Sequence, residues 1–318
     1  MRTYPAAARE DSGRPDDDSP TTTGDLMATL DGYGVLVTGG GSGIGEGCAL
    51  ALARDGAVVT ICGRTVDKLE AAAARIRDAV PGAGVHVIGA DVTDEAQVGA
   101  AVAKAIGEAG GLHGVVASAG GSLHLGPLHL ADVAAVRATL DLNVIGTFLT
   151  LKCATPALAE SARSGTGGSF VGVSSHAGLD SFRFMGAYGA AKAGLDHLLK
   201  VAADELGPSR VRVNSIRPGI IDNELMSMIT QGGPVMDSYL AEIPLHRAGT
   251  VDEVGALARF LVGPESAYIT GQNISIDGGQ SVRKGADYGF FAEGAYGSDP
   301  AWGLVVERPG SRDGGAQG

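Results

Sequence analysis

Short runs of β-branched residues alternate with alanine-rich amphipathic stretches along most of this chain. The runs predict strands at residues 34–39, 57–63, 85–91, 114–120, 168–175, 211–216 and 273–277. The amphipathic stretches predict helices at about residues 44–55, 66–79, 94–109, 131–160, 187–206 and 251–262. Because the strands are almost entirely apolar, helices should cover both of their faces. The pattern therefore predicts an α/β fold, a doubly wound parallel seven-stranded sheet in a single domain.

Three segments fall outside this alternation. Residues 220–247 form a long connection that is rich in methionine and is interrupted by "QGGP". Residues 281–318 follow the last predicted strand and combine many glycines with scattered aromatic residues. Residues 1–28 are rich in Asp, Pro, Thr and Arg, a composition that buries too little apolar surface to become ordered. We therefore expect a disordered tail at 1–28, a folded domain at 29–280 and a C-terminal extension at 281–318.

Charge and cysteine content exclude several classes of function. The 318-residue chain carries a formal net charge of −12 and has no Lys/Arg cluster, so it should repel nucleic acid. Cys48, Cys62 and Cys153 lie in separate apolar stretches without the spacing of metal ligands, so we expect buried, reduced thiols and no metal site. No run reaches the roughly 18 apolar residues of a membrane span, and the N-terminus lacks the apolar segment of a signal peptide. We expect a cytoplasmic protein that contacts neither nucleic acid nor membrane.

The stretch "TGGGSGIG", which begins at Thr38, lies between the first predicted strand and the first predicted helix. Glycines at such a turn allow positive φ and let the backbone approach a pyrophosphate, which would bind at the N-terminus of the new helix. Gly39, Gly43 and Gly45 carry this motif, with Thr38 and Ser42 as hydroxyl donors. A flexible linker is the alternative, but the flanking strand and helix favour a dinucleotide site.

The end of the second predicted strand indicates which nicotinamide cofactor is bound. Enzymes that use NAD(H) usually have an Asp or Glu here to bind the ribose 2′-hydroxyl. This chain has Gly63 followed by Arg64, whose guanidinium suits a 2′-phosphate. NADP(H) is therefore favoured and NAD(H) remains possible, through Asp67 if that side chain turned back, or if Arg64 is only a solvated arginine. Asp91 closes the third predicted strand, where it either holds the adenine edge or caps the next turn.

Six motifs occur together in one order along residues 34–280. They are Thr38-Gly-x-x-x-Gly43-x-Gly45, Asn143 in "LDLNVIGTF", Ser175 in "VSSHAG", Tyr188-x-x-x-Lys192, "NSIRPG" at 214–219 and "YITGQNISIDGG" at 268–279. In this order and spacing the chain resembles the short-chain dehydrogenase/reductase family. The resemblance implies one Rossmann-type catalytic domain and an oxidoreductase that transfers a hydride between a nicotinamide and a carbonyl or secondary alcohol.

The resemblance also implies a catalytic tetrad. Tyr188 would donate a proton to the substrate oxygen in reduction and remove it in oxidation, although a free phenol titrates near pH 10 and needs a positive neighbour to act near pH 7. Lys192 lies one helical turn later on the same face and can supply that charge; in the family it also binds the nicotinamide ribose. Ser175 would hold the substrate oxygen, and Asn143 would support a water-linked proton path to the lysine. Ser174 is the competing serine, but the family serine stands three residues before a glycine, as Ser175 does.

Further cofactor contacts are implied at positions that match the family pattern. They are Ile44, Asp91, Val92, Ala119, Gly120, Tyr188, Lys192, Pro218, Gly219, Ile221 and Asn223. Some residues depart from the pattern: Ala117 and Ser118 replace two asparagines that are frequent after the fourth strand, and Asn223 replaces a threonine near the nicotinamide carboxamide. Ser42 stands where many NADP(H)-preferring members have a basic residue, which leaves Arg64 as the only basic determinant.

The family geometry places the substrate between residues 120–126, 178–185 and 220–247. Seven apolar side chains there would form its wall: Leu123, Leu125, Leu179, Phe182, Phe184, Met226 and Met228. They indicate a hydrophobic ketone or secondary alcohol, such as a steroid-like, terpenoid or acyl compound, unless they only pack the connection against the core. His124 and His176 either line this site or lie behind it.

The family commonly forms tetramers, so we expect a homotetramer or homodimer that associates through the helices at 131–160 and 187–206. The aromatic residues of the C-terminal extension would dock on a neighbouring subunit, cover the pocket or remain peripheral. A cofactor-binding regulatory or scaffold protein without turnover is the alternative function, and the intact tetrad argues against it. An epimerase or dehydratase is disfavoured because the substrate region is short.

Overall fold

The structure is a computed structural model that describes residues 30–165, 167–283, 288, 291 and 294. The predicted tail at 1–28 and most of the C-terminal extension at 281–318 lie outside the described residues.

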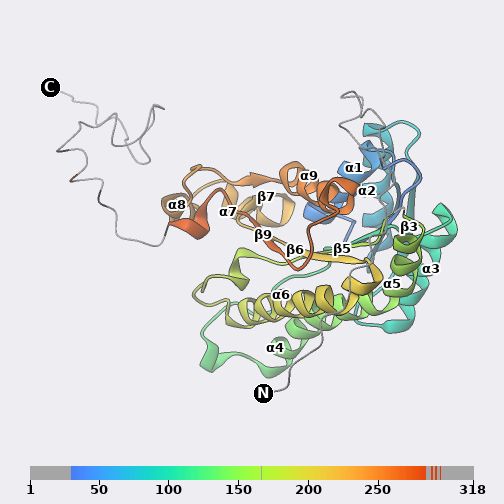
Figure 1. Ribbon diagram of the computed structural model, residues 1–318. Coiled ribbons are helices and arrows are strands. Elements are labelled where there is room, and N and C mark those ends of the chain that lie inside the picture. The colour runs from blue at the N-terminus through green and yellow to red at the C-terminus, as the bar shows by residue number, and fades with distance from the viewer. Residues whose placement is uncertain (1–29, 166, 284–287, 289–290, 292–293, 295–318) are drawn as a thin grey trace, which may run out of the picture.

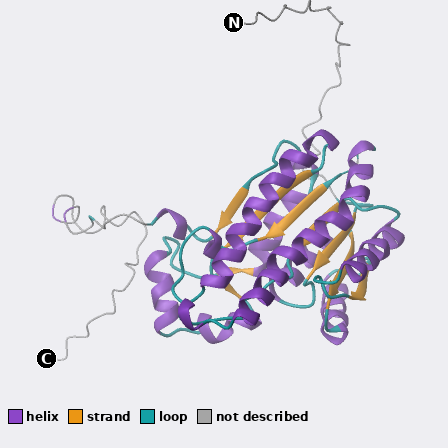
Figure 2. Ribbon diagram, turned by 90° about the horizontal axis from the view of Figure 1, so that it is seen from below, coloured by secondary structure: helices purple, strands orange, loops and turns teal. Residues whose placement is uncertain are grey.

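A seven-stranded parallel sheet forms the centre of the molecule, with the strand order β3-β2-β1-β4-β5-β6-β9 (Figures 1 and 2). The strands are β1 (Gly34–Thr38), β2 (Val58–Gly63), β3 (Val85–Gly89), β4 (Gly114–Ala117), β5 (Ser169–Val173), β6 (Arg212–Pro218) and β9 (Asn273–Ile276). The predicted doubly wound, Rossmann-type sheet in a single domain is confirmed. Because the chain runs outward in opposite directions from β1 and β4, their carboxyl ends form the crevice where such sheets bind ligands.

Helices cover both faces of this sheet (Figure 1). One face carries α1 (Gly43–Arg54), α2 (Val66–Ala79) and α9 (Val251–Val262), and the other carries α3 (Glu95–Ala109), α5 (Gly146–Arg163) and α6 (Gly186–Leu206). Successive residues of β1 alternate between the two layers, with Val35 and Val37 in the first core and Leu36 in the second. This alternation explains why the central strands β1, β4 and β5 are largely apolar, because each of their residues is buried whichever face it points to.

The helix predicted at residues 131–160 is divided into three segments. An α-helix, α4 (Val133–Leu140), is followed by one π-helical turn, Asp141–Ile145, and then by α5. Asn143 Nδ2 donates a hydrogen bond to Thr139 O (2.8 Å), and Thr147 Oγ1 donates to Asn143 O (2.9 Å). The predicted helical stretch is therefore present, with one wider turn at Asn143, where side chains bond to helix carbonyls.

Residues 133–163 are also the one helical run, within the described part of the chain, whose length and hydropathy suit a membrane span. The prediction concerned consecutive apolar residues, and Asp141, Asn143 and Lys152 interrupt this run. The run packs inside the fold, where Leu151, Ala154 and Leu158 join the core formed with α3 and α6. Core packing therefore accounts for the apolar residues on this face of the run, whereas Val133, Leu140, Ile145 and Phe148 are exposed.

The connection at residues 220–247 contains elements that the sequence pattern did not predict. They are β7 (Ile221–Asp222), a 3-10 turn (Glu224–Met226), α7 (Ser227–Thr230) and α8 (Pro234–Glu242). β7 pairs in parallel with β8 (Gly249–Thr250), just after the connection. A small core of its own, centred on Ile220, Met236 and Ile243, stabilises this region.

The three cysteines differ in burial. Cys48 and Cys62 are buried, and burial raises the pKa of each thiol to about 12, as expected for inert core thiols. Cys153 is only partly buried, so the prediction that all three are buried is wrong at this position. All three are free thiols.

Candidate active site

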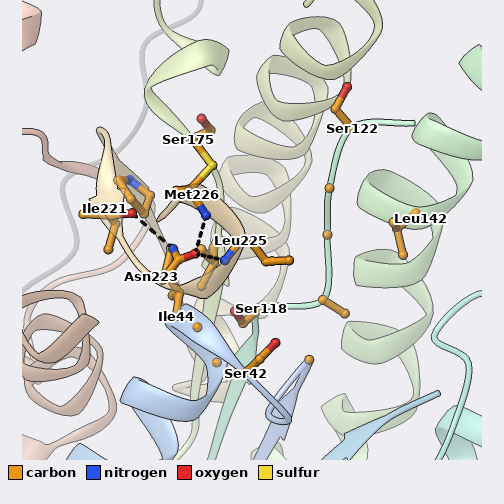
Figure 3. Close-up of a pocket in the computed structure, with 18 of the residues that line it drawn as sticks. Ser42, Ile44, Ser118, Ser122, Leu142, Ser175, Ile221, Asn223, Leu225 and Met226 are labelled. Carbon is orange, nitrogen blue, oxygen red and sulfur yellow. Dashed lines mark hydrogen bonds between the residues drawn. The ribbon is translucent and has the colours of Figure 1, made fainter. Parts of the chain in front are cut away.

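A cavity of about 660 Å³ opens at the carboxyl ends of the central strands, on the crevice between β1 and β4. The glycine turn after β1 lines one end, and side chains from α6 and from residues 225–239 of the connection line the other. Figure 3 shows Ser42 of the glycine turn at one end, Ser175 at the other, and Asn223 of the connection near the glycine turn. The first is called the cofactor end and the second the substrate end below.

Backbone geometry at the glycine turn requires the absence of side chains. Gly39 and Gly43 have φ values of 68° and 55°, in the left-handed region. A Cβ atom on Gly45 would lie 2.2 Å from Gly39 O, and one on Gly39 would lie 2.9 Å from Ala119 Cα. Ser42 lines the cavity just before α1 and makes no capping hydrogen bond with its side chain. The turn therefore presents backbone amides and the N-terminus of α1 to the cavity, an arrangement that suits a pyrophosphate.

Thr38 does not line the cavity, in contrast to its predicted role as a cofactor donor. Thr38 is only 2% exposed, and its Oγ1 accepts a hydrogen bond from Ala119 N (3.1 Å). The side chain therefore ties the end of β1 to the loop after β4. The other predicted cofactor residues all line the cavity: Gly39, Ser42, Gly43, Ile44, Gly45, Arg64, Asp91, Val92, Ala119, Gly120, Tyr188, Lys192, Pro218, Gly219, Ile221 and Asn223.

The far side of the cofactor end contains two cationic side chains. Arg64 and Lys68 both line it, together with Thr65. Asp67 is not among the lining residues, so the route to NAD(H) binding through its carboxylate has no support in the structure. Lys68, which lies in the first turn of α2, was missed from the sequence because no local signal shows which side of α2 faces the cavity.

Asp91 combines both roles considered for it. Its Oδ1 accepts hydrogen bonds from Thr93 N (2.9 Å) and Thr93 Oγ1 (2.8 Å), so it caps the turn after β3. These bonds lower the pKa of the carboxyl, and the charge of Arg64 adds a smaller effect in the same direction. Asp91 also lines the cavity, where it remains a carboxylate facing the cofactor end.

Tyr188 and Lys192 lie together on α6 at the substrate end. Lys192 Nζ is 5.6 Å from the centroid of the Tyr188 ring and donates a hydrogen bond to Val173 O (2.8 Å). Burial lowers the pKa of Lys192 to about 8, against the opposing effect of the Asp196 charge. Burial also raises the pKa of Tyr188, while a hydrogen bond with Ser175 lowers it. Tyr188 therefore releases its proton less readily than a free tyrosine, and Lys192 beside it releases its proton more readily than a free lysine.

The two candidate serines point to different partners. Ser174 is 3% exposed and donates its hydroxyl hydrogen bond to Lys192 O (3.3 Å). Ser175 bonds with Tyr188, and its Oγ accepts a hydrogen bond from Ala177 N (3.1 Å). The geometry therefore favours Ser175 over Ser174 as the serine whose hydroxyl lies beside that of Tyr188.

Asn143 is fully buried and lies behind the cavity wall instead of lining it. Its Oδ1 accepts from Gly121 N (3.1 Å), and its Nδ2 donates to Gly121 O (2.8 Å). A Cβ atom on Gly120 would lie 2.7 Å from Asn143 Oδ1 and 3.0 Å from Lys192 Nζ. Asn143 therefore fixes the strand-to-helix loop that separates it from Lys192, and glycine is required at 120 because both side chains press against it.

Asn223 faces the glycine turn, but its amide is used within its own turn (Figure 3). Oδ1 accepts hydrogen bonds from Leu225 N (2.9 Å) and Met226 N (3.1 Å), and Nδ2 donates to Ile221 O (3.2 Å). This cap orders the start of the 220–247 connection, so a contact from Asn223 to a carboxamide would compete with it.

A family model described as enoyl-(acyl carrier protein) reductase matches residues 39–281. Trans-4-hydroxycyclohexanecarboxylate dehydrogenase of Sinomonas cyclohexanicum is 36% identical over 251 residues, which cover 78% of this chain and 92% of that protein. The structure of a short-chain type dehydrogenase/reductase from Mycobacterium ulcerans matches with a TM-score of 0.77 and 43% identity, over 87% of this chain and 100% of that chain. This chain belongs to the short-chain dehydrogenase/reductase family.

Members of this family interconvert alcohols and carbonyl compounds with NAD(H) or NADP(H), and that general activity holds for this chain. A further relative is the 3-alpha-(or 20-beta)-hydroxysteroid dehydrogenase of Mycobacterium tuberculosis, 32% identical over 87% of this chain and 99% of its own length. A 7 alpha-hydroxysteroid dehydrogenase solved with NADH and 7-oxo glycochenodeoxycholic acid has a TM-score of 0.73 at 27% identity, over 79% of this chain and 95% of its own.

The substrate end of this short-chain dehydrogenase differs from the predicted apolar wall. Only Phe182 and Met226 of the seven predicted residues line the cavity. The other five are exposed to solvent: Leu123, Leu125, Leu179, Phe184 and Met228. The wall is completed by Leu142, Met185, Leu225 and Tyr239, which the sequence analysis missed. Tyr239 could not be placed because α8 was not predicted; its ring centroid lies 5.8 Å from that of Phe182.

The two histidines near the substrate end also differ. His176 lines the cavity and is 2% exposed, whereas His124 is not among the lining residues.

Proposed function

We propose that this protein is an NADP(H)-preferring oxidoreductase that transfers a hydride between the nicotinamide and a hydrophobic ketone or secondary alcohol. The observation that carries the proposal is one continuous cavity, with the glycine turn at one end and Ser175, Tyr188 and Lys192 at the other. Such an arrangement brings a nicotinamide and a carbonyl group within reach of one proton donor.

In the proposed reduction, Tyr188 donates its hydroxyl proton to the carbonyl oxygen, which Ser175 holds through a hydrogen bond. The charge of Lys192 stabilises the phenolate that remains until solvent returns a proton to it. When bound, the reduced nicotinamide supplies the hydride to the carbonyl carbon. In oxidation, Tyr188 accepts the alcohol proton. Asn143 acts from behind by fixing the loop beside Lys192, and its part in a proton path remains a prediction.

The preference for NADP(H) rests on Arg64 and Lys68 at the cofactor end. Two cations there favour a 2′-phosphate over a 2′-hydroxyl. Fluorescence titration of the protein with NADPH and NADH tests this preference, and Arg64→Leu should weaken NADPH binding about tenfold while leaving NADH binding unchanged. An equal loss of affinity for NADPH and NADH would show that Arg64 does not contact the 2′-phosphate.

The substrate class rests on the aromatic and methionine side chains at the substrate end, including Phe182, Met185, Met226 and Tyr239. The relatives named for hydroxysteroids and hydroxycyclohexanecarboxylate act on ring alcohols, and we propose a ring-containing ketone or alcohol here too. A screen of NADPH and NADH oxidation over a carbonyl panel tests the function. Turnover of bulky apolar ketones above small polar ones is expected, and equal turnover of both would contradict the substrate class.

We also propose a cytoplasmic homotetramer or homodimer. Exposed apolar side chains follow the outer surface of the long helices: Val133, Leu140, Ile145, Phe148 and Val201. Their association would remove this surface from water. Light scattering on the full chain should give a mass of two or four chains, and a monomer would refute the proposal.

A further inference from the structure

A buried histidine between two carboxylates lies directly beside Ser175. His176 Nε2 is 3.1 Å from Asp180 Oδ2, and His176 Nδ1 is 3.2 Å from Asp277 Oδ2. The side chains of His176, Asp180 and Asp277 are 3%, 20% and 5% exposed, so the group is largely shielded from solvent. The three residues are called the His176 cluster below. None of the three belongs to the predicted catalytic tetrad, yet His176 lines the cavity.

The two nearby carboxylates favour one protonation state of the His176 ring over the other. A neutral imidazole has one N–H and one bare nitrogen, so one carboxylate would face a lone pair. An imidazolium carries a positive charge and an N–H on each nitrogen, so it is attracted to both carboxylates at these distances. We propose that His176 is a positioning residue that, as an imidazolium, ties the loop carrying Asp180 to the end of β9 and thereby fixes the substrate end of the cavity.

Asp277 connects the cluster to the cofactor end. Its Oδ1 accepts a hydrogen bond from Gly279 N (2.9 Å), and its Oδ2 accepts one from Ser281 N (3.1 Å). A Cβ atom on Gly219 would lie 2.9 Å from Asp277 Cα, so the loop after β6 packs directly against it. The cluster therefore connects Asp180 to the hydrogen-bonded turn after β9.

Asp180 connects the cluster to the substrate wall. Phe182, two residues later, meets the His176 ring edge-on with centroids 5.7 Å apart and an interplanar angle of 88°. The Phe182 ring also contacts Tyr239 on α8. When His176 loses a proton, its attraction to the two carboxylates weakens, and we expect Asp180, the more exposed of the two (20% against 5%), to shift first. Rising pH should therefore loosen Phe182 and weaken substrate binding.

Other titratable groups on the packed elements must be separated from this effect. Tyr188 and Lys192 on α6 lie beside the turn that contains His176, and Arg217 on β6 is paired with Asp196 (2.6 Å). The titration of Lys192 should change kcat, because that residue acts on the proton donor. The His176 cluster should change KM, since it holds a wall that contacts substrate.

The first experiment reads the imidazole directly and does not depend on turnover. Histidine ring ¹³C and ¹⁵N shifts are recorded on the full-length protein between pH 6 and 9, with His176→Gln identifying the signal. An imidazolium at pH 7 is expected. A neutral His176 at pH 7 would overturn the proposal even if the enzyme is active, and would leave the proposed function untouched.

The second experiment rests on the proposed function and uses a bulky ketone found active in the panel. Asp180→Asn should raise KM about threefold to tenfold at pH 7, change kcat less than twofold and flatten the rise of KM with pH. Asp237→Asn, an exposed carboxylate on α8, is the matched control and should match the wild type. A pH-dependent KM retained in Asp180→Asn, or a loss confined to kcat, would contradict the positioning role.

Discussion

The two ends of the cavity are built in different ways. The cofactor end is lined mainly by backbone at or just after the carboxyl ends of strands, such as Gly39, Gly63 and Gly120. The substrate end is lined by side chains from long connections and α8, such as Phe182, Met226 and Tyr239. A turn attached to a strand has its position set by the sheet, whereas a connection takes its position from packing. The cofactor end can therefore be predicted from local sequence, whereas the substrate end depends on tertiary structure.

Replacement of Tyr188 by phenylalanine should have the largest effect, because it removes the proton donor that acts between the two ends. We expect kcat to fall by about 10²- to 10⁴-fold, with NADPH affinity unchanged by fluorescence titration. Because the ring is retained, packing at the substrate end should survive. A variant that keeps its wild-type kcat would remove the proton-transfer role from Tyr188.

Lys192→Met should lower kcat and, at the same time, stabilise the fold. Burial lowers the Lys192 pKa from 10.5 to about 8, so below pH 8 the folded state must hold a charge that it disfavours. Unfolded chains bind more protons between pH 8 and 10.5, so the wild type gains stability as pH rises through this window, up to roughly 3 kcal/mol. The variant should lack that gain. Denaturant unfolding at pH 7 and 9.5 measures it, and an equal pH response in both proteins would argue against a buried, strained ammonium.

Gly45→Ala should damage the cofactor end without touching the substrate end. The added Cβ would lie 2.2 Å from Gly39 O, so the turn must shift. NADPH affinity should fall about tenfold or more. Gly99→Ala in α3 is the matched control, because its Cβ would meet nothing within 4 Å. Wild-type affinity in Gly45→Ala would mean that the pyrophosphate binds elsewhere.

Two nearby methionines give the finest test of the substrate end. Met226 lines the cavity, whereas Met228 is 91% exposed. Met226→Ala should raise KM for a bulky apolar ketone severalfold, since one or two methylene contacts are worth about 1–3 kcal/mol. Met228→Ala should leave KM unchanged. The reverse pattern would mean that the connection has a different register over the cavity.

The same contrast decides what could be predicted from the sequence. The seven strands, the glycine turn and the Tyr188/Lys192 pair follow from local patterns. The structure confirms the strands and places the glycine turn and the pair around one cavity at their carboxyl ends. Thr38 was placed on the cofactor because its position in the motif does not show where its hydroxyl points. The exposed Leu125 and Met228 were assigned to the wall because apolar character alone cannot distinguish a lining residue from a surface residue.

Residues that reach the cavity only through tertiary packing were missed for a related reason. Lys68 and Tyr239 reach the cavity only because α2 and α8 are oriented by packing against other elements. The π-helical turn at Asn143 depends on a hydrogen bond between its side chain and Thr139 O, which no helical periodicity reveals.

Isotope transfer from the cofactor tests the central claim most directly. NADPH labelled with deuterium at C4 of the nicotinamide, in separate 4R and 4S forms, is incubated with the wild-type protein and an apolar ketone from the panel. The account predicts that one of the two forms places deuterium on the carbinol carbon of the product alcohol. Alcohol that carries no deuterium from either form, or no alcohol from any ketone, would contradict it.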